Sequence, residues 1–131
     1  MSDTTTSTHI AEVGRVMVPV ADQDQAIGFY LGKLGFEKRA DVPYGDGDRW
    51  VEVAPPGAVT GIALVPAREG EGGGVMSGVA LTSEDLDADH ADLRSRGVDV
   101  DAEIMRAGGP VPPMFFFRDQ DQNSLLIVAR M

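Results

Sequence analysis

Apolar and polar residues follow one another in blocks along the chain. An apolar run at residues 13–20 precedes the acidic residue Asp22, after which apolar side chains recur at helical spacing as far as Leu34. This order predicts a strand, a helix capped by Asp22 and a helix face that packs on a sheet. Gly35 follows the last apolar helical position and is expected to end the helix in a left-handed conformation.

The remainder of the first half predicts three more strands. Strands are expected at residues 36–41, 49–53, where apolar and polar residues alternate, and 60–65, and they are separated by segments rich in glycine, proline and aspartate. Such segments form turns, so the expected order is β-α-β-β-β. Pro19 cannot donate a ladder hydrogen bond, which places the first strand, or its end, at a sheet edge or a bulge.

The second half repeats this order at an almost constant offset. Val79 lies 63 residues after Val16, and Asp85 lies 63 residues after Asp22. Asp85 is expected to cap a second helix. The strands expected in this half are residues 75–82, 98–104, 114–118 and 124–129. A repeat of this length predicts two structurally equivalent modules.

The two modules predict an α+β fold in which two tandem β-α-β-β-β units form a curved, cup-shaped mixed sheet with helices on the outer face. We expect a disordered tail at residues 1–9 and a single domain at residues 10–131. Within that domain, module one spans residues 10–68 and module two spans residues 75–130, joined by a glycine-rich linker at residues 69–74.

Composition narrows the classes of function. The chain has 11 basic and 21 acidic residues, a net charge of −10, which disfavours nucleic acid because its phosphates require a basic surface. It has no cysteine and therefore no disulfide, thiolate metal ligand or cysteine nucleophile. No apolar run reaches the ~20 residues that cross a bilayer, and the polar residues 1–8 lack a signal-peptide core. We expect a cytoplasmic protein that binds neither nucleic acid nor membrane.

Several short motifs resemble those of one superfamily. They are Val20-Ala21-Asp22, Phe29-Tyr30, Leu34-Gly35-Phe36, Arg96-Gly97-Val98 and residues 117–123. Together with the tandem repeat, they resemble the vicinal oxygen chelate superfamily, which includes glyoxalase I, extradiol dioxygenases and bleomycin-resistance proteins. The resemblance covers nearly the whole chain and implies the fold, but this fold hosts many different functions.

In metal-using members, the resemblance implies four ligands (His, Gln or Glu), one from the first and one from the last strand of each module. The matching positions here are Arg15, Ala63, Gly78 and Leu126. None supplies the carboxylate oxygen, imidazole nitrogen or thiolate that divalent metals bind, and the permanent charge of arginine repels a cation. Neighbouring positions supply no such donor either. We therefore expect no metal site and no cofactor.

Alternation along the strands predicts what lines the cup. The expected ligand-binding residues are Arg15, Met17, Trp50, Glu52, Met114, Phe116 and Val128. Trp50 and Glu52 share a face, but the sequence does not determine which one, and the same side chains are equally suited to filling a core. Because burying an unpaired arginine costs several kcal/mol, Arg15 predicts either a carboxylate partner such as Glu52 or an anionic ligand.

Two further features have structural interpretations. His90 lies on the apolar stripe of the second helix and is expected to be half-buried on the outer side of the sheet, whereas His9 is expected to be solvated in the tail. The family usually has glycine before Asn123, where this chain has Gln122. Either Gln122 adopts the left-handed backbone, at a cost of about 1 kcal/mol, or Asn123 does.

Three functions are open at this stage. The first is a metal-free protein of the bleomycin-resistance type that binds a small molecule in an apolar and aromatic cup. The second is a metal-independent isomerase or lyase in which Arg15 stabilises charge and Glu52, inside the cup, is the base. The third, a metal-dependent lyase or dioxygenase, is disfavoured by the missing ligands.

The resemblance also implies a homodimer, with modules paired within a chain or exchanged between chains. The sequence does not identify the ligand, because two features conflict. The net charge of −10 suits a cation, whereas Arg15 favours a carboxylate.

Overall fold

The computed structural model describes residues 7–68 and 74–131. Module one contains β1 (Arg15–Val20), α1 (Gln23–Gly32), β2 (Glu37–Pro43), β3 (Arg49–Ala54) and β4 (Gly61–Pro66), and module two contains β5 (Met76–Ser83), α2 (Leu86–Ser95), β6 (Asp99–Val100), β7 (Met114–Arg118) and β8 (Ser124–Ala129). The disordered tail and the linker predicted from the sequence fall largely on residues 1–6 and 69–73, outside the described residues. Neither described helix is long and apolar enough to cross a membrane.

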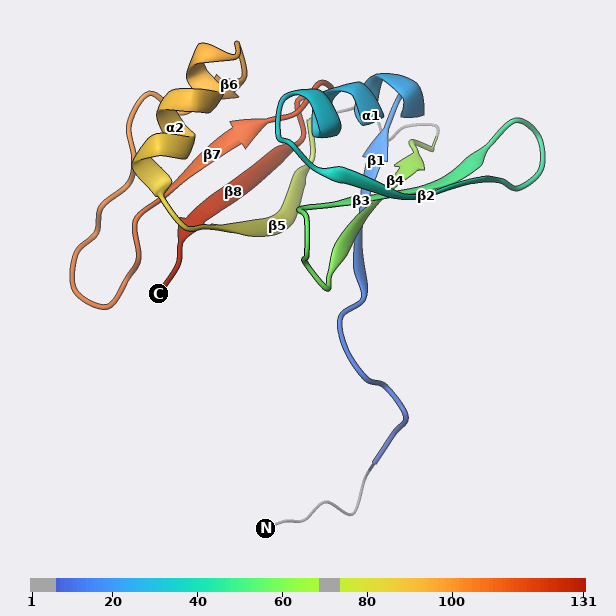
Figure 1. Ribbon diagram of the computed structural model, residues 1–131, viewed down its shortest axis with the longest axis horizontal. Coiled ribbons are helices and arrows are strands. Elements are labelled where there is room, and N and C mark those ends of the chain that lie inside the picture. The colour runs from blue at the N-terminus through green and yellow to red at the C-terminus, as the bar shows by residue number, and fades with distance from the viewer. Residues whose placement is uncertain (1–6, 69–73) are drawn as a thin grey trace.

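Each module forms its own four-stranded sheet (Figure 1). The strand order is β1-β4-β3-β2 in sheet one and β5-β8-β7-β6 in sheet two. In each sheet the first and last strands of the module pair in parallel, and the other pairs are antiparallel. The α+β class and the two tandem modules are therefore confirmed, and β1, which contains Pro19, lies at an edge as predicted. The two sheets stay separate rather than closing into one.

The helices cover one side of the sheets, with α1 over sheet one and α2 over sheet two (Figure 1). Residues on the helix side are buried, among them Val51 and Val53 of β3 and Phe115 and Phe117 of β7. Residues of opposite parity point to the other side, which we call the open face of each sheet. Alternation along each strand thus separates a core from a surface that is available for binding.

Side-chain caps fix where the two helices begin. The Asp22 carboxylate accepts a hydrogen bond from the Gln25 amide at 3.0 Å, and the Asp85 carboxylate accepts one from the Ala88 amide at 3.2 Å. Such caps satisfy amide groups that have no partner within the helix. Gly35 has a φ of 76°, the left-handed conformation predicted for the end of the first helix.

The ends of the two helices meet in a nearly symmetric contact. Lys33 Nζ donates to the Arg96 carbonyl at 2.6 Å, and Arg96 Nη1 donates to the Lys33 carbonyl at 2.8 Å. The two residues are 63 positions apart, the same offset as the repeat. The modules are therefore related by an approximate two-fold axis that passes near this pair.

A buried polar cluster joins the modules beside that contact. The Tyr30 hydroxyl donates to Asp119 Oδ2 at 2.8 Å, and Asn123 Nδ2 donates to the same oxygen at 3.0 Å and to the Pro19 carbonyl at 2.9 Å. Burial, and then the Asp119 charge, raise the pKa of the Tyr30 phenol well above its usual range. In the same turn Gln122 has a φ of 65°, so Gln122 rather than Asn123 takes the left-handed position.

The strand predicted at residues 98–104 is wrong in length, because only Asp99–Val100 is strand. The cause lies at Asp101. Its carboxylate accepts the Phe116 amide at 3.2 Å, while its carbonyl lies 2.7 Å from His90 Nε2. The Asp101 amide still donates to the Phe116 carbonyl at 3.0 Å, but the return hydrogen bond goes to the Asp101 side chain instead of a backbone carbonyl, and the regular strand ends here. His90 also packs edge-on against Phe115 at 4.7 Å between ring centroids, which confirms its predicted half-buried position on the helix side.

Candidate functional site

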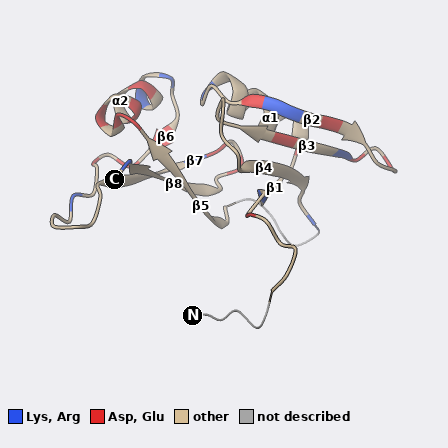
Figure 2. Ribbon diagram, turned by 60° about the horizontal axis from the view of Figure 1, so that its bottom comes forward, with Lys and Arg blue, Asp and Glu red and all other residues tan. Residues whose placement is uncertain are grey.

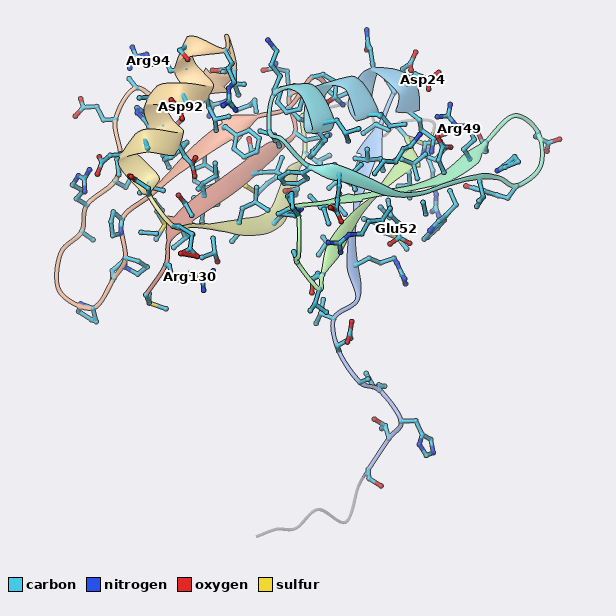
Figure 3. All side chains as sticks on the ribbon, in the orientation of Figure 1. Asp24, Arg49, Glu52, Asp92, Arg94 and Arg130 are labelled. Atoms are coloured by element: carbon cyan, nitrogen blue, oxygen red, sulfur yellow. The ribbon has the colours of Figure 1, made fainter. Side chains whose placement is uncertain are left out.

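The polar residues predicted for the cup come together on the open face of sheet one. Glu52 Oε2 accepts a hydrogen bond from Arg15 Nε at 2.9 Å and another from the Trp50 indole nitrogen at 2.6 Å. Glu52 lies on the side of the sheet away from α1, whereas Arg49 and Asp24 lie on the helix side (Figure 3). The face that the sequence left undetermined for Trp50 and Glu52 is thus the open one.

These contacts show whether Arg15 has a partner within the chain. Its partner is the Glu52 carboxylate, one of the two possibilities left open by the sequence. The pair is partly solvated, since the Arg15 side chain is 48% exposed and that of Glu52 17%. Arg15 Cζ also lies 6.0 Å from the centroid of the Trp50 ring, within the range of about 6 Å typical of cation–π contacts. Glu52 therefore holds a cation and an aromatic ring in fixed positions.

A cavity of about 680 Å³ lies next to this group of side chains. Its lining comes from β1, from the end of β4 and from the hairpin between β2 and β3. The lining residues are Met17, Pro19, Tyr44, Asp48, Trp50, Val65, Pro66, Ala67 and Arg68. We call it the sheet-one cavity. Its volume falls within the ~300–1,000 Å³ typical of small-molecule sites, and its lining combines apolar and aromatic surface with a few polar groups, as such sites do.

Of the residues that line this cavity, only Met17 and Trp50 were among the ligand-binding residues predicted from the sequence. Tyr44 and Asp48 belong to a segment that was interpreted only as a turn, and Val65 only as the end of a strand. A signal was present, because Asp48 precedes Trp50 by two residues and so has the parity of the open face. The position of Tyr44 depends on the hairpin, where the Tyr44 amide donates to the Asp48 carbonyl at 3.0 Å.

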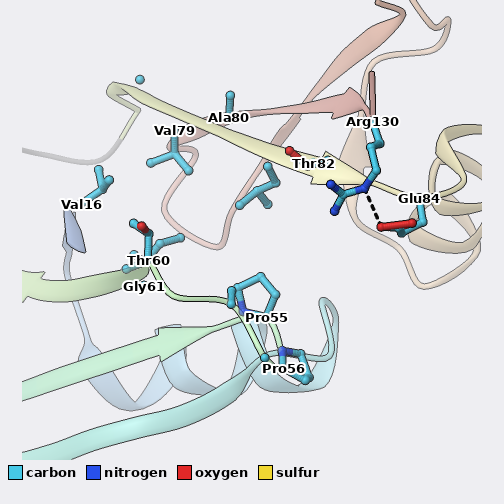
Figure 4. Close-up of a pocket in the computed structure, with 15 residues that line it drawn as sticks. Val16, Pro55, Pro56, Thr60, Gly61, Val79, Ala80, Thr82, Glu84 and Arg130 are labelled. Carbon is cyan, nitrogen blue, oxygen red and sulfur yellow. Dashed lines mark hydrogen bonds and ion pairs between the residues drawn. The ribbon is translucent and has the colours of Figure 1, made fainter. Parts of the chain in front are cut away.

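A second cavity, of about 540 Å³, lies between the modules (Figure 4). Prolines and glycines of module one face apolar residues of β5 across it. Three of its polar side chains already have partners, since Arg130 Nε lies 2.6 Å from Glu84 Oε2 and the Thr60 hydroxyl donates to the Val13 carbonyl at 2.6 Å. This cavity has few polar groups that are available to orient a ligand. The sheet-one cavity is therefore the better candidate for a ligand-binding site.

The predicted site residues of module two are not gathered with those of module one. Met114, Phe116 and Val128 lie on the open face of sheet two, where Met114 pairs with Val128 across the strands. None of the three lines the sheet-one cavity. Within a single chain, the open faces therefore carry two separate groups of side chains, a polar and aromatic one on sheet one and an apolar one on sheet two.

The residues at the family's metal-ligand positions do not fit a metal. Arg15 is engaged with Glu52, Ala63 and Leu126 carry only hydrocarbon side chains, and Gly78 has none. Glu52, which is paired with Ala63 across the strands, adds one carboxylate beside these positions. Within residues 7–68 and 74–131, no three His, Cys, Asp or Glu side chains converge as metal ligands do. The side chains at these four positions are not among the ligands that divalent cations prefer.

The charged residues elsewhere on the sheets serve mainly to join strands. Arg49 lies 2.9 Å from Asp41, and its hydrogen bond is the main reason that the pKa of the Asp41 carboxyl is lowered. Arg118 contacts Asp99 at 3.0 Å and lowers the pKa of that carboxyl in the same way. Figure 2 shows acidic residues on α2, while β5 and β8 are uncharged.

Comparison with known proteins identifies the type of fold. The family described as "Glyoxalase/Bleomycin resistance protein/Dioxygenase superfamily" matches residues 12–127. Protein YetH of Bacillus subtilis (strain 168), described as uncharacterized, is 33% identical over 121 residues, which cover 90% of this chain and 98% of YetH.

Two solved structures show the same architecture. The structure of TnmS3, described as an antibiotic binding protein from Streptomyces sp. CB03234, is 36% identical with a TM-score of 0.82, and the match covers 95% of this chain and 100% of that one. A member of the Glyoxalase/bleomycin resistance protein/dioxygenase superfamily from Sphaerobacter thermophilus is 33% identical with a TM-score of 0.85, over 94% of this chain and 100% of that one.

Proposed function

Because the chain belongs to the Glyoxalase/Bleomycin resistance protein/Dioxygenase superfamily, we propose that it binds a small organic molecule in the sheet-one cavity, without a metal. The observation that carries the proposal is the cavity of about 680 Å³ beside Trp50, whose ring is held by Glu52. The description of TnmS3 as an antibiotic binding protein supports it. Affinity comes from burying apolar and aromatic surface, and a few polar groups orient the ligand.

The alternative that the chain is a metal-independent isomerase or lyase is less well supported. It requires Glu52 on the open face, and Glu52 is there. However, one carboxylate oxygen of Glu52 already accepts hydrogen bonds from both Arg15 and Trp50. That shared oxygen orients Arg15 and Trp50, which supports a positioning role, and proton transfer would have to use the other oxygen, Oε1.

We also propose that two copies assemble as a homodimer. The open face of sheet two presents Met114, Phe116 and Val128, all partly exposed and without charge. A second copy that places this face opposite Trp50 of the first would complete a cup containing all the residues expected from the sequence. Burying such apolar surface is favourable by about 25 cal/mol per Å².

Sedimentation equilibrium tests the assembly. The expected mass is twice the 13.9 kDa of one chain, and Phe116→Glu is expected to give monomers because it buries a charge in the interface. Val59→Glu is the control, since Val59 is 72% exposed in the turn between β3 and β4. Circular dichroism confirms that each variant is folded. A wild-type protein that stays monomeric at all concentrations would contradict the homodimer.

A thermal-shift screen of chemically diverse small molecules tests the binding function. A compound at about 100 times its Kd stabilises a folded protein by about 2.7 kcal/mol, so binders raise Tm with dose. The shift is expected to disappear in Trp50→Ala and to be partly retained in Trp50→Phe, which keeps an aromatic ring. Binders whose shift is unchanged in Trp50→Ala would place the site elsewhere.

A further inference from the structure

The charges around the sheet-one cavity indicate which ligands it favours. Arg15 is the residue that argued for an anionic ligand, but the Glu52 carboxylate 2.9 Å away neutralises its charge. Net attraction of an anion to this pair is therefore weak. Because Glu52 neutralises the charge of Arg15, Arg15 no longer argues for an anionic ligand. The negative net charge of the chain, which favours a cation, is then unopposed by Arg15.

The aromatic ring of Trp50 in the lining is suited to contact with a cation. The polar edge of Trp50 is occupied, because its indole nitrogen donates to Glu52 at 2.6 Å. What remains for a ligand is the part of the ring that Arg15 does not cover, and the ring faces carry the negative part of the aromatic quadrupole. Arg15 Cζ at 6.0 Å from the ring centroid shows that the indole already accommodates a cation. Tyr44 adds a second aromatic ring to the lining.

Asp48 supplies a carboxylate to the lining of the cavity. Across residues 7–68 and 74–131, the Asp48 side chain has no ion pair or hydrogen bond, although its backbone is held in the hairpin by Tyr44 and Gly45. Arg68 also lies in the lining and has an interaction of its own. The chain's net charge of −10 adds a negative potential, which raises the local concentration of cations.

We propose that the sheet-one cavity prefers flat organic cations, with the ring of the ligand against Trp50 and its positive nitrogen toward Asp48. This inference rests on the proposed binding function and specifies the class of ligand. Two attractions act together on such a molecule, cation–π contact with Trp50 and Tyr44 and charge attraction to Asp48. An anion of the same shape meets the same ring but is repelled by Asp48.

Three probes that share a naphthalene ring and differ in charge separate the effect of ligand charge on affinity from that of ligand shape. They are 2-(aminomethyl)naphthalene, a cation at neutral pH, 2-naphthalenemethanol, which is neutral, and 2-naphthoate, an anion. Isothermal titration calorimetry at neutral pH and low salt measures the Kd of each. The cation is expected to bind about fivefold more tightly than the neutral probe, and the anion more weakly than either.

Two matched variants test whether Asp48 causes the preference for cations. Asp48→Asn is expected to weaken cation binding about fivefold, to the level of the neutral probe. Asp46→Asn changes the net charge of the same hairpin equally, but Asp46 does not line the cavity, so the cation is expected to retain its affinity. Asparagine tolerates the backbone of Asp46, whose φ is 44°. Thermal unfolding of both variants confirms that they are folded.

The outcomes distinguish this inference from the function on which it rests. Equal affinities for the three probes would overturn the preference for cations and leave the binding function in place. Equal losses in Asp48→Asn and Asp46→Asn would overturn the specific contact with Asp48, since only the overall charge would then matter. Failure of all three probes to bind would overturn both the preference and the proposed site.

Discussion

The two modules share a strand order and helix caps but differ in what their open faces carry. The open face of sheet one holds the linked side chains of Arg15, Glu52 and Trp50. At the repeat equivalent of Arg15, 63 residues later, module two has Gly78. Its open face is instead apolar around Phe116, which is paired to Leu126. The same scaffold thus supplies a linked polar and aromatic group in one module and an apolar surface around Phe116 in the other.

The cores of the modules differ in a corresponding way. On the helix side, sheet one is packed with small aliphatic residues such as Val51 and Val53, whereas β7 of sheet two contributes Phe115 and Phe117. Phe117 also stacks on Phe29 of α1, with 6.5 Å between ring centroids. A side chain of module two therefore helps to hold the helix of module one, and the stability of the two modules is linked.

The largest expected effect on stability comes from removing this contact between the modules. Phe117→Ala removes a fully buried ring from the contact between modules and is expected to lower the free energy of unfolding by about 3–5 kcal/mol. Val53→Ala, also fully buried but within module one, is expected to cost about 1–3 kcal/mol. Urea unfolding followed by circular dichroism measures both. Equal losses would show that the contact between modules adds nothing to ordinary core packing.

The sequence predicted the scaffold well because a repeat and strand alternation are local signals. The pattern around Asp22 and Asp85 located both helix caps, and alternation separated the core residues of β7 from those of the open face. It failed at Asp101, where side-chain and histidine contacts from distant residues end the strand. Residues that line a cavity through hairpin geometry, such as Tyr44, had no local signal.

A second, smaller effect concerns the buried cluster between the modules. Tyr30→Phe removes the 2.8 Å hydrogen bond to Asp119 and leaves that buried carboxylate with fewer donors. The expected loss is about 1–3 kcal/mol in the free energy of unfolding. Tyr44→Phe is the control, since Tyr44 is 51% exposed on module one and is expected to stay within about 0.5 kcal/mol.

The same cluster predicts an alkaline dependence. Burial raises the folded-state pKa of Tyr30 above that of the unfolded chain, which is about 10. Its contribution to stability is therefore complete below pH ~10 and is lost as the pH rises further. Wild-type unfolding free energy is expected to fall more steeply above pH ~10 than that of Tyr30→Phe. Parallel pH profiles for the two proteins would contradict the assignment to Tyr30.

The smallest effect compares the strand-joining arginines of the two modules. Arg49 lowers the pKa of the Asp41 carboxyl and Arg118 that of the Asp99 carboxyl. A depressed folded-state pKa contributes stability above the unfolded value of about 4, and this stability is lost as the pH falls below it. Arg49→Gln and Arg118→Gln are each expected to flatten the acid limb of the unfolding profile. Unchanged limbs would show that these partly exposed pairs contribute nothing measurable to stability, as is common for ion pairs near the surface.

The central claim is that small molecules bind beside Trp50, on module one rather than in the cavity between the modules. The chain has one tryptophan, so ¹⁵N-labelled protein gives one indole N–H signal in a heteronuclear NMR spectrum. On titration with a compound that raises Tm, we predict that this signal shifts, together with the amides of Met17 and Val65, which line the same cavity. An unmoved indole signal, with shifts confined to Val79 and Thr82 of the cavity between modules, would contradict the claim.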